Sequence, residues 1–194
     1  MDDKNLTLRL ALAHTKGLGP VHARELLARL GSVEAVFAET VDSLVKLGLD
    51  RTVANYMLSA ENMAFAKKEL HFLMANGVQV VFLGDKEYPF RLRECADAPV
   101  LFLFKGNCSL SAPKMLAVVG TRHATEQGKA FTRQLVSDLA KRHPDLVVVS
   151  GLAYGIDVTA HKAALESGLS TIGVMATGLD RLYPAQHKKV DSLM

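Results

Sequence analysis

Residues 150–157 have the sequence Ser-Gly-Leu-Ala-Tyr-Gly-Ile-Asp and follow the apolar run Leu146–Val149. A helical pattern rich in alanine then continues from Val158 to Leu165. A β-branched run, a turn of small residues and a helical pattern, in this order, indicate a strand, a tight turn and a helix. Ligands of open α/β sheets bind where such strands end. The stretch therefore predicts an α/β fold with a ligand site at this turn.

A second copy of this pattern lies about thirty residues upstream. An expected strand at 115–119 runs into Gly120-Thr121-Arg122, and a helical pattern follows over 125–142. Parallel strands place the turns at their carboxyl ends on one edge of the sheet. Glycine lets backbone N–H groups approach a phosphate, a helix N-terminus adds partial positive charge, and the Arg122 guanidinium is a bidentate donor. We therefore expect this edge to bind an anion.

The composition is that of a globular protein with a local binding site. The chain has 194 residues, 49% of them apolar, and a formal net charge of +3, so a polyanion site must be built by a few placed cations. Its two cysteines, Cys95 and Cys108, lack metal-ligand spacing and are expected to be free thiols. No apolar run approaches the ~20 residues of a membrane span, and the acidic N-terminus is unlike a secretory leader, so we expect a cytoplasmic protein.

The pattern changes from helical to β/α near residue 77. Residues 1–77 form helical patterns, among them one long pattern from Asn55 to Met74, and Gly77 is typical of a helix C-cap. Residues 78–194 alternate between β-type and helical segments, which indicates a mostly parallel, doubly wound sheet. The strands of this sheet are expected at 78–83, 100–104, 115–119, 146–150 and 170–175, with helices at 125–142 and 156–167.

The helical part contains a faint repeat. Gly17-Leu18-Gly19 is followed by Ala23, and Gly48-Leu49-Asp50 by Ala54, thirty-one residues later. The pattern resembles paired helix-hairpin-helix motifs, whose exposed N–H groups can hold a DNA phosphate, so Gly17 and Gly19 are candidates for a secondary DNA contact. Asp50 places a negative charge in the second copy where a phosphate would dock. The alternative is a packing or partner-binding module.

Five ordered blocks over residues 88–184 resemble the DprA/Smf family of DNA-processing proteins, a combination much more specific than one glycine-rich turn. The blocks are G-T-R at 120–122, S-G-L-A-x-G-I-D at 150–157, A-H-x-x-A-L at 160–165, T-G-L-D-x-x-Y-P at 177–184, and the approach to the sheet at Tyr88–Leu92, Ala98–Phe102 and Lys105–Asn107.

The resemblance implies a Rossmann-like domain over 78–194, with a doubly wound sheet, after a small helical domain over 1–77. It also implies further strands beyond Met194, so we expect a fragment or a truncated product whose sheet is incomplete at its C-terminal end. The implied function is sequence-independent binding of single-stranded DNA, without catalysis, in natural transformation and recombination. The implied partners are the RecA recombinase, which such proteins load onto DNA, the single-strand-binding protein and a second copy of the chain.

Residues of the two turns are the candidates for DNA contact. Arg122 follows a strand-end glycine and is expected to hold a phosphate, as the resemblance also implies; a salt bridge to Asp157 is the alternative. Gly120 and Thr121 belong to the same turn. In the second turn Ser150, Gly151 and Gly155 are expected to offer hydroxyl and N–H donors, although Ser150 and Gly155 could serve geometry alone.

Three further features flank these turns. Lys162 belongs, by resemblance, to the basic pocket of the family, and a solvated lysine is the alternative. Tyr154 and Tyr183 are the candidate rings for base stacking. Asp157 and His161 are four residues apart, and we expect a structural hydrogen-bonded pair, with no metal and no cofactor.

Two other functional classes remain open on the sequence alone. One is a nucleotide-binding enzyme related to phosphoribohydrolases, against which stand the lack of a G-x-G-x-x-G turn, a P-loop and a convincing nucleophile–base pair. The other is a protein-docking module carried by the helical domain. Saturable binding of oligonucleotides but not of free nucleotides distinguishes the DNA-binding class from both.

Overall fold

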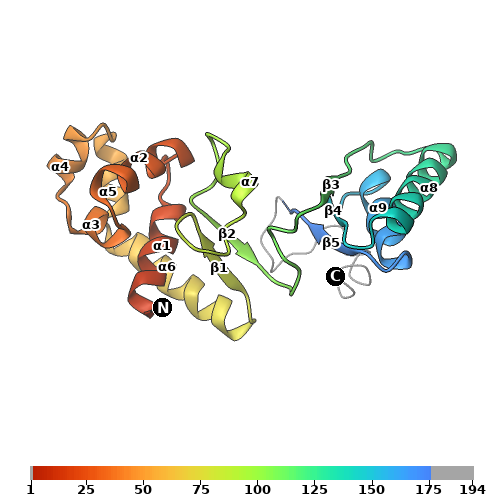
Figure 1. Cartoon of the computed structure of the whole chain (residues 1–194). Helices are drawn as coiled ribbons and strands as arrows, with labels where there is room; N and C mark the ends of the chain where they lie inside the picture. The colour runs from red at the N-terminus through yellow and green to blue at the C-terminus, as the bar shows by residue number, and fades with distance from the viewer. Residues whose placement is uncertain (1, 176–194) are drawn as a thin grey trace. The chain divides into compact units, whose positions relative to one another are not determined.

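The computed structural model describes residues 2–175, which form two compact units, one ending at Lys105 and the other beginning at Gly106 (Figure 1). The elements of the first unit are α1 (Asp3–His14), α2 (Pro20–Leu30), α3 (Val33–Ala38), α4 (Val41–Lys46), α5 (Arg51–Met57), α6 (Ala60–Ala75), β1 (Gln79–Phe82), α7 (Phe90–Arg93) and β2 (Leu101–Phe104). Those of the second are β3 (Met115–Ala117), α8 (Glu126–Arg142), β4 (Val147–Ser150), α9 (Ile156–Glu166) and β5 (Ser170–Gly173).

The predicted long helix from Asn55 to Met74 is wrong, because the chain breaks into α5 and α6. The Ser59 hydroxyl accepts the N–H of Asn62 at 3.1 Å and so caps a new helix. The Asn62 amide is fully buried and donates to the carbonyl oxygens of Ala11 and Met57, both at 3.1 Å. The cap and these bonds hold the bend between the two helices, which the continuous apolar pattern does not reveal.

The first two strands form a sheet of their own. β1 and β2 pair antiparallel, with Val80 opposite Leu103, whereas the sequence predicted that both join the parallel sheet. Phe82 and Val100 lie in the same core as the apolar side chains of α1 to α5. This packing explains why the compact units divide at Lys105, while the sequence placed a domain boundary near residue 77.

The second unit contains the predicted parallel sheet, in the order β3-β4-β5. Leu116 of β3 lies opposite Val148 of β4, which lies opposite Thr171 of β5. Because strand order follows chain order and such crossovers are right-handed, α8 and α9 lie on one face of the sheet, as Figure 1 shows. The mixed α/β fold with a helical N-terminal part is thus confirmed.

The helix-covered face of β4 encloses the core of this unit. Val148 and Val136 are fully buried there, together with the small residues Ala160 and Ala164, which let α9 approach the sheet closely. A second winding direction, which a doubly wound sheet needs, is not found within residues 2–175 and stays a prediction. Within the same range, no helix combines the length and apolar character needed to cross a membrane.

Candidate nucleic-acid interface

The two glycine-bearing turns contact each other at the carboxyl edge of β3 and β4, as predicted from their parallel pairing. The N–H of Ile156, at the start of α9, donates to the carbonyl oxygen of Thr121 at 3.2 Å. The N–H of Gly120 donates to Oδ1 of Asp157 at 3.3 Å. Each turn therefore supports the conformation of the other.

Glycine is required where the turns meet. Gly155 has φ +81° and ψ −120°, a conformation that side chains rarely adopt. A Cβ there would lie 2.8 Å from the carbonyl carbon and oxygen of Arg122, and closer still to the carbonyl oxygen of Thr121. A Cβ on Gly120 would collide with the Ile156 side chain. Both glycines thus allow the backbones of the two turns to approach each other.

Asp157 joins both turns from the first turn of α9. Asp157 is only 6% exposed, and its Oδ2 would lie 2.9 Å from a Cβ placed on Gly151. The sequence did not single out this bridging role, because only the fold brings Gly120 and Gly151 to the same carboxylate. The one feature of the sequence that pointed to a structural role for Asp157 was its position at the start of a helix.

Arg122 is exposed at this edge. The alternative of a salt bridge between Arg122 and Asp157 is not realised: within residues 2–175 no carboxylate lies within 4.0 Å of the guanidinium. The hydroxyl oxygen of Thr121 accepts the N–H of His123 at 3.1 Å, which leaves the hydroxyl proton to donate elsewhere. The loop therefore presents a cation and a hydroxyl on a braced backbone.

Two groups that the sequence offered as anion donors are engaged within the fold. The Ser150 hydroxyl donates to the carbonyl oxygen of Val118 at 2.7 Å, and the residue is 4% exposed. At the start of α9, the N–H groups of Ile156, Val158 and Thr159 all donate to backbone carbonyls. Ser150 therefore joins β4 to β3, the geometric alternative, and the N–H groups of Ile156 and Val158 in the first turn of α9 are not available to an anion.

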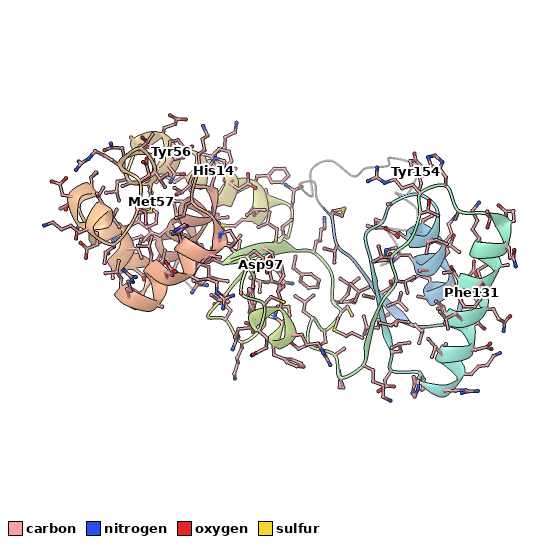
Figure 2. The ribbon with its side chains drawn as sticks, turned by 90° about the horizontal axis from the view of Figure 1, so that it is seen from above. His14, Tyr56, Met57, Asp97, Phe131 and Tyr154 are labelled. Carbon is pink, nitrogen blue, oxygen red and sulfur yellow. The ribbon has the colours of Figure 1, made fainter. Side chains whose placement is uncertain are left out.

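The remaining candidates of the second unit lie on or before α9. Lys162 is exposed in its second turn, and Tyr154, in the turn before the helix, is 38% exposed (Figure 2). Gly151 is also exposed, whereas Gly155 is half-buried between the turns. The T-G-L-D-x-x-Y-P block at 177–184, with Tyr183, lies outside the described residues.

His161 and Asp157 have different hydrogen-bond partners. The Thr171 hydroxyl donates to the carbonyl oxygen of Val148 at 2.8 Å, so its oxygen accepts the proton of His161 Nδ1 at 2.7 Å. Asp157 accepts from Gly120 instead. His161 is fully buried and ties α9 to β5, a structural role. Within residues 2–175, no three His, Cys, Asp or Glu side chains gather as metal ligands would.

The two hairpins of the first unit differ at the helix start. Gly19 caps α2 without any side-chain acceptor, and Gly17, at φ +82°, packs against Val53. In the second hairpin the Asp50 carboxylate accepts the N–H of Thr52 at 2.7 Å, and this bond holds the pKa of Asp50 below its ordinary value. The second helix start thus already has an anion of its own, while the first offers its N–H groups to solvent or a ligand.

Comparison with known proteins decides the family. A family model described as DNA recombination-mediator protein A matches residues 79–194. The chain belongs to the DNA recombination-mediator protein A family. The resemblance stated from the sequence motifs is therefore confirmed, and the braced G-T-R and S-G-L-A-x-G-I-D turns lie inside the matched region.

Individual members of the DNA recombination-mediator protein A family show the same relationship. The DNA processing protein DprA of Streptococcus pneumoniae is 45% identical over 106 residues, which cover 55% of this chain and 36% of that protein. Protein Smf of Escherichia coli is 28% identical over 191 residues, covering 98% of this chain and 49% of that protein. The X-ray structure of DNA processing protein A from Streptococcus pneumoniae matches 96% of this chain and 63% of that chain, with a TM-score of 0.74 and 32% identity. The chain spans between about a third and a half of these curated relatives.

Proposed function

We propose that the chain binds single-stranded DNA through its phosphate backbone, at the edge formed by the turns 120–122 and 151–155. One observation carries this proposal: the turns brace each other through Gly155, Asp157 and the Ile156 N–H, and so hold Arg122 exposed without a carboxylate partner in the described residues. A guanidinium on a rigid loop is suited to phosphate, which carries no sequence information. Binding is therefore independent of base sequence.

The proposed contacts follow from the charge, the hydrogen-bond donors and the exposed ring surface of the side chains at this edge. Arg122 and Lys162 supply charge, Thr121 supplies a hydroxyl proton, and Tyr154 offers a half-exposed ring to a base. The proposed site consists of Gly120, Thr121, Arg122, Gly151, Tyr154, Gly155 and Lys162, with the glycines shaping the surface. Ser150 lies outside this site, because its hydroxyl proton is engaged with the carbonyl oxygen of Val118. Gly17 and Gly19 stay a predicted secondary contact, which the uncapped start of α2 supports.

The biological setting is proposed from the family and from the names of its members, which describe DNA processing. We assign the chain to DNA uptake and homologous recombination in the cytoplasm, as a binding protein and not an enzyme. RecA loading, contact with single-strand-binding protein and homodimer formation are proposed for the complete protein, since the relatives are two to three times as long as the part matched here.

Fluorescence anisotropy of labelled oligo-dT tests the central proposal. We expect the chain to bind oligo-dT more tightly than an equal-length duplex, with strong salt dependence, and to leave a labelled mononucleotide free. Arg122→Ala should weaken binding by about tenfold or more and reduce the slope of log K against log salt by about 0.7, the value for one phosphate on a single strand.

Arg142→Ala is the matched control. Arg142 is an exposed arginine of the same unit at the end of α8, and because α8 runs antiparallel to the strands it lies at the opposite edge of the sheet. Its loss should leave affinity within about twofold, since only a distant charge is removed. Equal losses in both variants would reduce the proposal to a general charge effect, and saturable binding or hydrolysis of the mononucleotide would favour the enzyme class instead.

A further inference from the structure

A groove between α1 and α6 gives the first unit a surface that lies outside the proposed DNA site. Its volume is about 620 Å³, within the usual range for ligand pockets. The two helices run antiparallel here, since Asn62, at the start of α6, bonds to Ala11 and Thr15 near the end of α1. The groove is lined by Asp3, Lys4, Thr7 and Leu8 of α1 and by Met63, Lys67, Leu70, His71 and Met74 of α6.

The floor of the groove is apolar and adaptable. Leu8 and Leu70 are each 7% exposed and form its base, while Met74 is 60% exposed. Met63 lies between these extremes, partly buried against the core. Methionine is flexible and polarizable, so a groove lined by it can accommodate apolar side chains of different shapes. The floor is therefore suited to anchor side chains of a peptide.

The rim carries more basic than acidic side chains. Lys4 and Lys67 line the groove from opposite helices, and in the described part of the chain neither has a carboxylate within 4.0 Å. His71 adds a third basic side chain beside Lys67. Asp3 is the one acidic residue of the lining, and it lies at the end of the groove where α1 starts. A ligand with negative charge beside its apolar anchors complements this arrangement.

We infer that the groove between α1 and α6 is a docking site for an acidic, amphipathic peptide segment of a partner protein. Apolar anchors of the peptide insert between Met63 and Met74, and its carboxylates face Lys4, Lys67 and His71. The Asp3 carboxylate repels acidic groups at one end, so it favours one direction of the bound peptide. The site is independent of the proposed DNA edge, because every lining residue belongs to the first unit.

Peptide titration of the full 194-residue chain tests this assignment. The probe is a fluorescein-labelled peptide that combines aspartates with two phenylalanines, and the comparison peptide has lysine in place of each aspartate. We expect saturable, salt-sensitive binding of the acidic peptide alone. Lys67→Glu should weaken it by about tenfold, because a favourable charge becomes a repulsive one. Met74→Glu, in an exposed part of the groove, should weaken it similarly.

Two neighbouring substitutions serve as matched controls. Lys68→Glu makes the same charge reversal and Ala75→Glu introduces the same acidic side chain, both at exposed positions of α6 that do not line the groove, and we expect binding within about twofold of the unchanged chain. The assignment is overturned if the folded chain binds neither peptide, if it binds both peptides equally, or if the control substitutions weaken binding as much as Lys67→Glu and Met74→Glu. Single-stranded DNA binding should be unchanged in all four variants.

Discussion

Gly155→Ala tests whether contact between the two turns shapes the proposed DNA site. The new Cβ would lie 2.8 Å from the backbone of Arg122 and closer to Thr121, below the 3.0 Å that real Cβ atoms respect. The colliding atoms are backbone atoms of a hydrogen-bonded turn, so no side-chain rotation relieves the contact. The unfavourable φ costs about 1–3 kcal/mol, and displacing the turn adds about 1–3 kcal/mol. We therefore expect a loss of about 2–6 kcal/mol in the free energy of unfolding of the second unit.

Gly168→Ala separates the collision from the backbone strain. Gly168 also has a positive φ, of +73°, but apart from its neighbours in the chain no residue has an atom within 4 Å of its Cβ position. Its substitution should cost only about 1 kcal/mol. Urea unfolding followed by far-UV circular dichroism measures both variants, and oligo-dT anisotropy should show weaker binding for Gly155→Ala alone. Equal stability losses, together with unchanged DNA affinity in Gly155→Ala, would refute the reasoning that the turns depend on this contact.

Three further substitutions test other parts of the molecule. Asn62→Ala removes a fully buried amide that donates to two carbonyls, and it should destabilise the first unit by about 2–4 kcal/mol in urea unfolding. Asp157→Ala frees the Gly120 N–H and should weaken oligo-dT binding severalfold, while Asp157→Asn, which keeps an acceptor oxygen, should lose less. Burial, and secondarily the charge of Lys16, hold the pKa of His14 below its ordinary value of 6.5. The unfolded chain therefore takes up this proton at a higher pH than the folded one, so the free energy of unfolding of the first unit is greatest above pH 6.5 and decreases as the pH is lowered below 6.5. Thermal unfolding across this range should show the loss, and His14→Phe should abolish it while keeping the stack on Phe65.

Each of these predictions has its own control. Asn55→Ala removes an exposed amide from α5 and should leave stability within about 0.5 kcal/mol. An Asp157→Asn variant that loses as much DNA affinity as Asp157→Ala would show that charge, and not the bond to Gly120, supports the loop. If the pH dependence of stability persists unchanged in His14→Phe, a group other than His14 causes it.

Local signals predicted the second unit well. The expected helix over 125–142 is found at Glu126–Arg142, because Thr125 is a strong N-cap whose hydroxyl accepts the N–H of Gly128. The expected strand over 146–150 is found at Val147–Ser150. In both, the residues that decide the element are neighbours in the sequence, so composition and spacing are sufficient.

Long-range contacts explain the two predictions that were wrong, the pairing of the first two strands and the continuous helix from Asn55 to Met74. The strands β1 and β2 are β-type in sequence, but their partner and direction depend on which core encloses Phe82 and Val100, and this is the core of the helical unit. The break between α5 and α6 is maintained by bonds from Asn62 to Ala11 of α1 and to Thr15 just after this helix, about fifty positions away. Neither contact leaves a periodic trace in the sequence.

The sequence by itself determined the family and the order of strands, turns and helices around residues 115–175, and it predicted Arg122 as the leading candidate for phosphate contact. These follow from short motifs, in which glycine, β-branched residues and helix caps act on their immediate neighbours. Only the tertiary structure decided which donors remain available at the edge. Hydrogen bonds across about thirty residues engage Ser150 with Val118 and Asp157 with Gly120. A side chain's chemistry is local, but its burial and its partners are set by the fold, and these decide whether it is left to bind a ligand.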